Sequence, residues 1–155
     1  MKKQLGITII EMTLYIAIVA LISTSLVTLY IQIIQLRTRA TAIQEVNESI
    51  RLVSSKISQE IRQANKINGI GTSLSLSSIE VGRNPTTFEL NNGRIRMTVG
   101  TSAAFISSNL VDISEFTLTN LSSGDSLSQN VRFTITGSYL NNTATITNSV
   151  EVRSK

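Results

Sequence analysis

The sequence predicts an α+β protein in which one long N-terminal α-helix packs on a small antiparallel β-sheet. No charged residue occurs between Met12 and Leu36. Apolar residues then recur at helical spacing, and from residue 69 onwards short strand-like runs alternate with turns rich in Asn, Ser and Gly. We therefore expect four segments, of which the last two form one globular domain: residues 1–6, 7–36, 37–68 and 69–155.

The composition argues against an enzyme. The 155 residues include no Cys and no His, which excludes disulfides, His-based acid–base catalysis and zinc sites built from those ligands. We expect no catalytic residue, no metal site and no cofactor. The net charge of +4 is too small to argue for a nucleic-acid partner.

The first element expected along the chain is a membrane span. Met12 to Ile31 is a run of 20 residues whose polar side chains are Thr, Ser and Tyr alone, close to the roughly 20 residues that cross a bilayer core as a helix. A long C-terminal domain translocates largely regardless of the flanking charge. We expect a single-pass protein of the cytoplasmic membrane, with its C-terminal domain outside the cytoplasm.

Three other interpretations of this apolar run stay open. A buried helix of a soluble protein is disfavoured by the length of the run. A secretory signal peptide could be cleaved near residues 23–25, but apolar sequence resumes at Leu26. A plain signal anchor fits best of the three, although it leaves unexplained why Glu11 stands at the head of the run.

The helix is predicted to continue beyond Leu36 as an amphipathic one. No Gly or Pro occurs between residues 7 and 68, and Gly69 supplies a stop signal, so we expect the helix from Ile7 to about Lys66. Apolar residues at three- and four-residue spacing form a stripe that the sheet would cover: Ile43, Val46, Ile50, Val53, Ile57 and Ile61. The charged residues fall largely off this stripe: Arg51, Lys56, Glu60 and Arg62.

Six strand-like runs are predicted after the helix, joined as antiparallel hairpins. Asn91-Asn92-Gly93 is the strongest turn signal, because Asn and Gly tolerate the positive φ that tight hairpins need. A phase slip at Ser78-Ile79 suggests a bulge or an edge in the first run, and Asn141-Asn142 is expected to form the last turn. The six runs are residues 74–81, 87–90, 94–99, 114–121, 131–139 and 143–153.

The N-terminus resembles the signal of type IV pilins and type II secretion pseudopilins. Lys2-Lys3-Gln4-Leu5-Gly6 is a short basic leader that ends in glycine, and Ile7-Thr8-Ile9-Ile10-Glu11 places a glutamate fifth after that glycine, ahead of the apolar run. Ser58 to Ile67 resembles the helix end of minor pilins and J-type pseudopilins. The resemblance implies the pilin fold and favours a minor subunit of such a filament.

The resemblance also implies roles for three residues. A prepilin peptidase would cut after Gly6, which makes residues 1–6 a leader peptide, and Ile7 would become the N-methylated N-terminus. Glu11 would pair with the N-terminal amine of a neighbouring subunit and so set the helix register in a filament whose core is residues 7–36. The partners would be the peptidase, other pilin or pseudopilin subunits and the cytoplasmic membrane.

Other functions stay open beside this one. A minor or tip subunit could bind DNA or a secreted substrate with its sheet, since Arg83, Arg94 and Arg96 could bring positive charge to one hairpin. A plain single-span anchored binding domain is a further alternative, and a pilus, a secretion pseudopilus and a competence pseudopilus are equally compatible with the resemblance. The spacing of Asp112, Glu115 and Asp125 matches no calcium-binding loop, so no calcium site is predicted.

Overall fold

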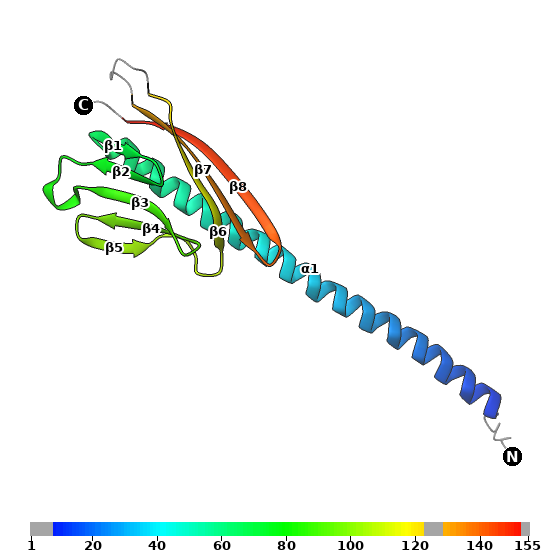
Figure 1. The fold of residues 1–155 in the computed structure, drawn as a ribbon. Helices are drawn as coiled ribbons and strands as arrows, with labels where there is room; N and C mark the ends of the chain where they lie inside the picture. The colour runs from blue at the N-terminus through cyan, green and yellow to red at the C-terminus, as the bar shows by residue number, and fades with distance from the viewer. Residues whose placement is uncertain (1–7, 123–128, 153–155) are drawn as a thin grey trace. The chain divides into compact units, whose positions relative to one another are not determined.

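The computed structural model describes residues 8–122 and 129–152 and divides into two units, Met1–Ala40 and Thr41–Lys155. Helix α1 (Ile9–Gln63) provides nearly all of the described part of the first unit and the opening of the second (Figure 1). The described part of the second unit adds eight β-strands and a short 3₁₀ helix, η1 (Val81–Arg83). The predicted α+β class, with a long N-terminal helix packed on antiparallel sheet, is confirmed.

Five of these described strands form the first sheet, an antiparallel meander in chain order. The turn between its third and fourth strands is Asn92-Gly93, with φ of 49° and 69°, so the predicted Asn-Gly hairpin is confirmed. The strands are β1 (Lys66–Ile70), β2 (Ser73–Ser77), β3 (Thr86–Asn91), β4 (Arg94–Val99) and β5 (Ser102–Phe105).

Three longer strands form the second sheet, also an antiparallel meander: β6 (Asp112–Asn120), β7 (Asn130–Tyr139) and β8 (Asn142–Glu151). The alternation predicted along β7 is confirmed, because Val131, Phe133 and Ile135 are fully buried. The opposite face carries threonines that bond across the strands, with Thr134 Oγ1 and Thr136 Oγ1 each 3.0 Å from a threonine hydroxyl of β8. This sheet therefore has one apolar and one hydroxyl-rich face.

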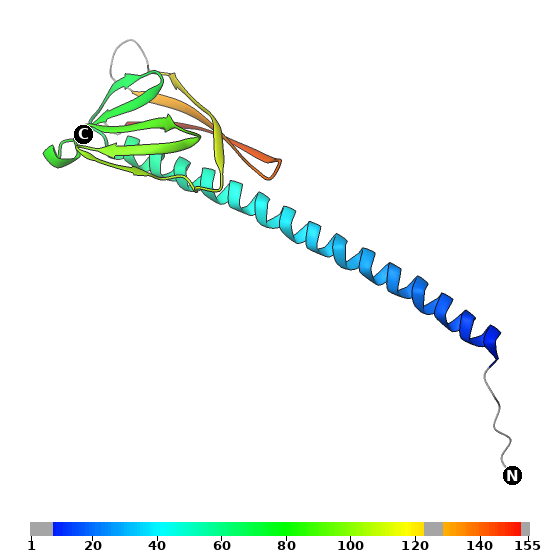
Figure 2. The same ribbon diagram turned by 60° about the horizontal axis from the view of Figure 1, so that its bottom comes forward.

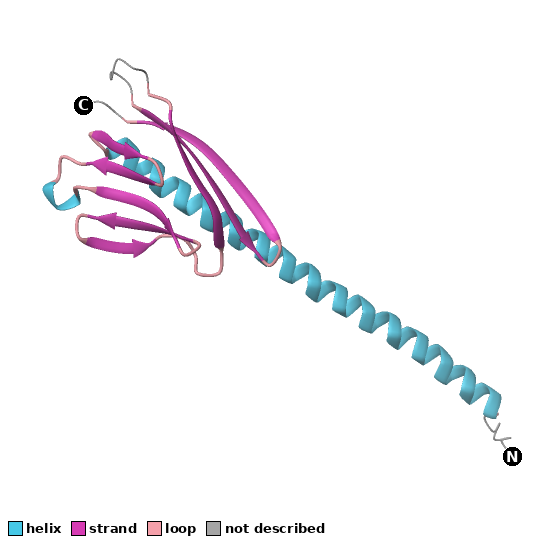
Figure 3. Cartoon of the chain, viewed as in Figure 1, coloured by secondary structure: helices cyan, strands magenta, loops and turns pink. Residues whose placement is uncertain are grey.

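Both sheets and residues 46–61 of α1 share one apolar core within the second unit (Figure 3). Five residues of the predicted stripe are at most 1% exposed, namely Val46, Ile50, Val53, Ile57 and Ile61. The prediction is wrong for Ile43, which is 48% exposed, while Ala42 is 1% exposed. The buried side of the helix at this end therefore includes Ala42 instead of Ile43. Ser49, two helical turns after Ala42, is buried on the same side.

Several described elements differ from the prediction in their bounds, and two strands were missed. Helix α1 ends at Gln63 rather than near Lys66, because the N–H of Asn65 already donates to the carbonyl of Ser77 in β2. Strands β1 and β5 were not predicted. Strand β2 ends at Ser77, so the phase slip after it marks the end of the strand rather than a bulge. The last turn is Leu140-Asn141, with φ of 46° and 63°, one residue earlier than predicted.

Candidate assembly site

The described chain begins with a helix cap at Thr8. The Thr8 hydroxyl accepts a hydrogen bond from the backbone N–H of Glu11 at 3.3 Å, and its carbonyl accepts one from Met12 at 3.1 Å. Thr8 is thus the N-cap residue and Glu11 the third residue of the helix, the spacing of a capping box. Sequence analysis missed the role of Thr8, although the pattern Thr-x-x-Glu is a recognised signal for a helix start.

Glu11 lies in the first turn of α1, as predicted. The positive end of the helix dipole favours an anion at this position. Within residues 8–122 and 129–152, no side chain forms an ion pair or hydrogen bond with the Glu11 carboxylate. Gly6 and Ile7, which the resemblance assigns to cleavage and methylation, lie outside the described residues.

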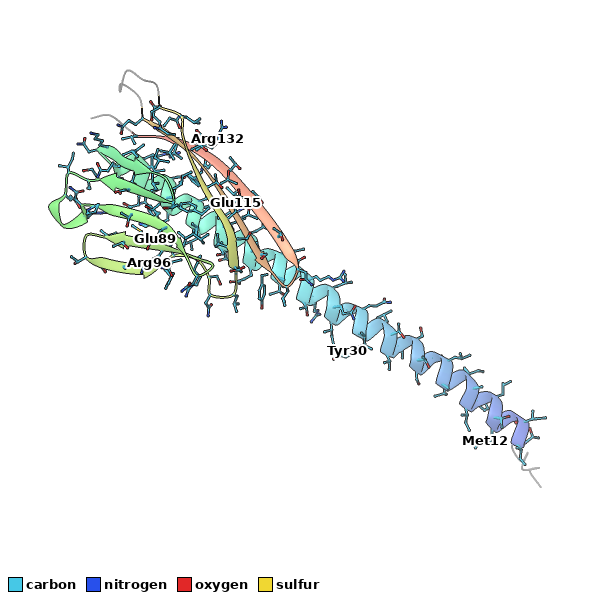
Figure 4. All side chains as sticks on the ribbon, viewed as in Figure 1. Met12, Tyr30, Glu89, Arg96, Glu115 and Arg132 are labelled. Atoms are coloured by element: carbon cyan, nitrogen blue, oxygen red, sulfur yellow. The ribbon has the colours of Figure 1, made fainter. Side chains whose placement is uncertain are left out.

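The helical surface of residues 9–40 is uncovered, and from Met12 to Leu36 it carries no charged side chain. Every residue of this stretch is exposed, and its large apolar side chains include Ile9 at 86% and Leu21 at 73% exposure. The side chains of Met12 and Tyr30 project from the bare helix in Figure 4. A helix that is apolar all round needs an apolar environment, either lipid or other helices.

Three threonine hydroxyls of this surface are satisfied by the helix itself. The hydroxyls of Thr13, Thr24 and Thr28 donate to backbone carbonyls of the preceding turn, at 2.9, 2.6 and 2.9 Å. Such bonds let a threonine face lipid without an unpaired donor. Thr28 therefore adds no obstacle to burial in an apolar environment.

Among the described residues, α1 is the one helix long and apolar enough to cross a membrane. Its most apolar 18-residue window has a mean hydropathy of 2.2, and none of that window is buried. Because this window is not buried, it is unlike the core helix of a soluble protein, which was the first of the three other interpretations of the apolar run. A signal sequence near an N-terminus passes the same test.

The three arginines considered for DNA binding are all engaged. Arg83 binds both carboxylate oxygens of Glu60 at 2.8 Å, and Arg96 pairs with Glu89 across β3 and β4 (Figure 4). Arg94 donates to the carbonyl of Ser107 and stacks 4.3 Å from the ring centre of Phe105. Arg83 lies in η1, apart from the hairpin that carries the other two.

The acidic residues considered for calcium do not form a ligand set in the described residues. Glu115 accepts hydrogen bonds from Thr117 and Thr136 on the outer face of the second sheet. Asp125 lies outside the described residues. No group of three His, Cys, Asp or Glu residues in the described ranges could hold a metal ion.

Glu60 is a buried charge that the sequence did not reveal. Its side chain is 5% exposed, although the helical pattern placed it off the apolar stripe. Arg83 and Lys56 both pair with it, at 2.8 and 3.1 Å. These charges compensate the buried carboxylate and tie the C-terminal end of α1 to η1. The cluster stabilises the fold and leaves no unpaired group for chemistry.

No family model, no curated protein and no solved structure matches this chain.

Proposed function

We propose that this chain is a structural subunit of a type IV pilus-like or type II secretion pseudopilus filament. It would be stored in the cytoplasmic membrane and assembled after cleavage between Gly6 and Ile7. The observation that carries the proposal is the exposed surface of residues 9–36. It is apolar around the helix and has one carboxylate, without a partner in the described residues, in its first turn. The leader that precedes it resembles that of prepilins.

Membrane storage and filament assembly would cover the same surface in turn. In the membrane, lipid surrounds residues 9–36. In the filament, the same stretch of neighbouring subunits replaces lipid, and the contacts are made by packing of helix against helix. Residues 41–155 already have a core of their own, so the transfer requires no refolding of that unit.

Glu11 would supply the specificity that apolar packing lacks. A charged side chain within the hydrocarbon region is costly, about 2.5–3.5 kcal/mol at a helix centre and less near an end. In the proposed filament, the new N-terminal amine of Ile7 on a neighbouring subunit would neutralise it. Only one helix register brings the two charges together, so the pair would set the stagger between subunits.

Cleavage is the first step to test, in cells that express the chain together with a prepilin peptidase. We expect mass spectrometry to find a product that begins at Ile7 and carries an N-methyl group. Gly6→Leu should remain uncut, because the bulky side chain blocks the peptidase. Intact, unmodified chain in both the parent and the Gly6→Leu variant would contradict the proposal.

Assembly is the second step, measured as subunits in sheared filaments from cells that carry the whole assembly system. Glu11→Ala should abolish or strongly reduce incorporation while leaving the amount of membrane-stored subunit unchanged. Glu48→Ala is the matched control, because Glu48 is an exposed glutamate in the part of α1 that belongs to the second unit. A plain membrane anchor predicts that Glu11→Ala and Glu48→Ala behave alike.

The alternative of a minor or tip subunit that binds DNA has one favourable feature. The half-buried Arg94 stacks with Phe105, which is 43% exposed, and both exposed aromatic rings and arginine cation–π contacts contribute to single-strand binding. Carboxylates neutralise Arg83 and Arg96, however. Retention of the full chain on single-stranded DNA should therefore be weak, and it should fall as salt rises if Arg94 contributes.

A further inference from the structure

The turn between β7 and β8 combines three unfavourable or unusual properties in one residue, Leu140. Its φ of 46° lies in the left-handed region, where an L-residue with a side chain is strained. The position is the first of a two-residue hairpin turn, where Asn or Gly is the usual choice. The side chain is also 56% exposed. Neither the turn nor the core of the second unit gains from a leucine here.

Strand β7 brings this turn to the end of the second unit where that unit begins, at residue 41 of α1. The N–H of Ile67, past the end of α1, donates to the side chain of Gln129, just before β7. Eight residues further along the chain, the Cα of Gly137 lies against Ile50. Leu140 is three residues beyond, about 10 Å at strand spacing. The same distance along α1 is about seven residues, so Leu140 lies level with Ile43.

A second exposed leucine lies beside Leu140. Leu110, which is 50% exposed, lines the same shallow depression as Leu140 and Tyr139. The segment that carries it is tied to the start of the second unit, because Ser108 donates to Glu45 at 2.7 Å and accepts from the N–H of Leu110. Figures 1 and 2 both show the β7–β8 turn and the segment before β6 at one end of the unit.

We use the name apolar rim for three exposed side chains of the second unit. Leu110 and Leu140, which are 50% and 56% exposed, line the same depression, and Ile43 of α1 is 48% exposed. One acidic residue, Asp112, also lines the depression. Its Oδ1 lies against the backbone of Gly93, and the carboxylate of Glu45 is bonded to Ser108. The tyrosine beside the leucines is of the type that favours membrane interfaces, with an apolar ring and a polar hydroxyl.

Chain connectivity sets how far the rim can lie from a membrane. The apolar run ends at Leu36, and four residues, 37–40, separate it from the second unit. The rim lies level with Ile43, seven helical residues or about 10 Å beyond Leu36, and the headgroup region on each side of the hydrocarbon core is about 5–8 Å thick. The rim is therefore within the length of a side chain of the headgroups. Arg37 and Arg39 within this connection are suited to anionic headgroups.

We infer that the apolar rim contacts the headgroup region of the membrane that holds residues 9–36. The inference rests on the membrane storage in the proposed function. The rim then holds the second unit on the bilayer surface until assembly. A leucine that strains its own turn gains an apolar environment that solvent does not provide.

The test uses the full chain in vesicles of phosphatidylcholine and phosphatidylglycerol, at a density at which most vesicles hold one chain. The sequence lacks Cys, so Leu140→Cys, Leu110→Cys and Ile22→Cys each accept one environment-sensitive fluorophore. Ile79→Cys is the control for the second unit. Ile79 is 70% exposed and lines a depression with Gln63 and Asn65, about 30 Å along the helix from Ile43.

We expect the labels at positions 140 and 110 to show blue-shifted, severalfold brighter emission than the label at 79. Nitroxide lipids labelled near the headgroup should quench the label at 140, and those labelled deep in the acyl chain should quench the label at 22. If the label at position 22 is quenched while the labels at 140 and 110 emit like the label at 79, the inference about the apolar rim is wrong and the membrane span stands. If 22 is not quenched either, the proposed membrane storage itself fails.

A second copy of this chain could also cover the rim. In that event the emission at 140 would rise only when the number of chains per vesicle is raised, and shallow nitroxide lipids would not quench it. That outcome would overturn the lipid contact and assign the rim to a subunit interface. A signal that is independent of protein density and quenched by shallow nitroxides supports the lipid contact.

Discussion

Helix α1 carries isoleucines along most of its length, and these side chains have opposite environments in the two units. Ile22 and Ile31 are 55% and 49% exposed, whereas Ile50 and Ile57 are fully buried. The residue type is the same, so the difference comes from the pattern. Residues 12–36 have no polar face and define no preferred side. Residues 42–61 instead carry most of their apolar side chains on one stripe that the chain's own sheets cover.

The two parts of this one helix thus suit two different kinds of apolar surroundings. A stripe specifies a partner with a matching shape, and here that partner is the core of the second unit. A surface that is apolar all round specifies an apolar solvent or many equivalent neighbours. Substitutions in the two parts should therefore differ in what they affect: stability of the second unit in one part, insertion and assembly in the other.

The largest expected effect comes from removing a buried side chain of the stripe. Ile57→Ala should lower the free energy of unfolding of the second unit by about 2–5 kcal/mol, because it leaves a cavity between α1 and the sheets. Pulse proteolysis of the full chain in mild detergent, over a range of urea concentrations, measures this loss. Ile22→Ala is the matched control and should leave the unfolding midpoint unchanged. Equal losses in the two variants would contradict the division of α1.

The next effect concerns the close approach of the second sheet to α1. A Cβ at Gly137 would lie 3.0 Å from side-chain atoms of both Ile50 and Val111. Gly137→Val should therefore cost about 1–3 kcal/mol of unfolding free energy through overpacking. Gly69→Val is the control, because a Cβ at Gly69 meets nothing within 4 Å. If Gly137→Val left the unfolding free energy unchanged, the sheet and the helix would be less tightly packed than described.

The parts of the fold that were predicted correctly depend on local sequence. The stripe from Val46 to Ile61 and the Asn92-Gly93 turn follow from helical spacing and from the tolerance of Asn and Gly for positive φ. Strands β1 and β5 were missed because their short sequences, Lys66–Ile70 and Ser102–Phe105, lack a clear alternation. Their neighbours β2 and β4 supply the pairing that makes them strands.

The burial of Glu60 could not be predicted either, because it depends on Arg83, which is 23 residues away. At the candidate site, the sequence placed Glu11 correctly in the first turn of α1, and the Thr-x-x-Glu pattern could also have identified Thr8 as the cap. The exposure of residues 9–40 is a property of the single chain. The cover that the proposed function gives this surface, lipid or other subunits, lies outside the single chain.

A smaller effect is expected for the ion pair that ties the end of α1 to η1. Arg83→Met leaves the buried Glu60 carboxylate with Lys56 alone, and it should cost on the order of 1–2 kcal/mol in the same proteolysis assay. Arg83 is 38% exposed, and solvent screening keeps the loss below that of a fully buried pair. Arg96→Met is the control. Its partner Glu89 is 34% exposed, so the loss there should be at most a few tenths of a kcal/mol.

The smallest effect has the opposite sign and concerns the strained turn. Leu140→Asn should stabilise the second unit by up to about 1 kcal/mol, because Asn tolerates the left-handed region better than Leu. Leu110→Asn is the matched control. Leu110 is similarly exposed but has no positive φ, so its replacement should leave the unfolding midpoint unchanged. A gain at position 140 alone would show that this leucine weakens its own unit, as expected for a residue kept for a contact outside it. An equal response at both positions would remove backbone strain as an argument for the apolar rim.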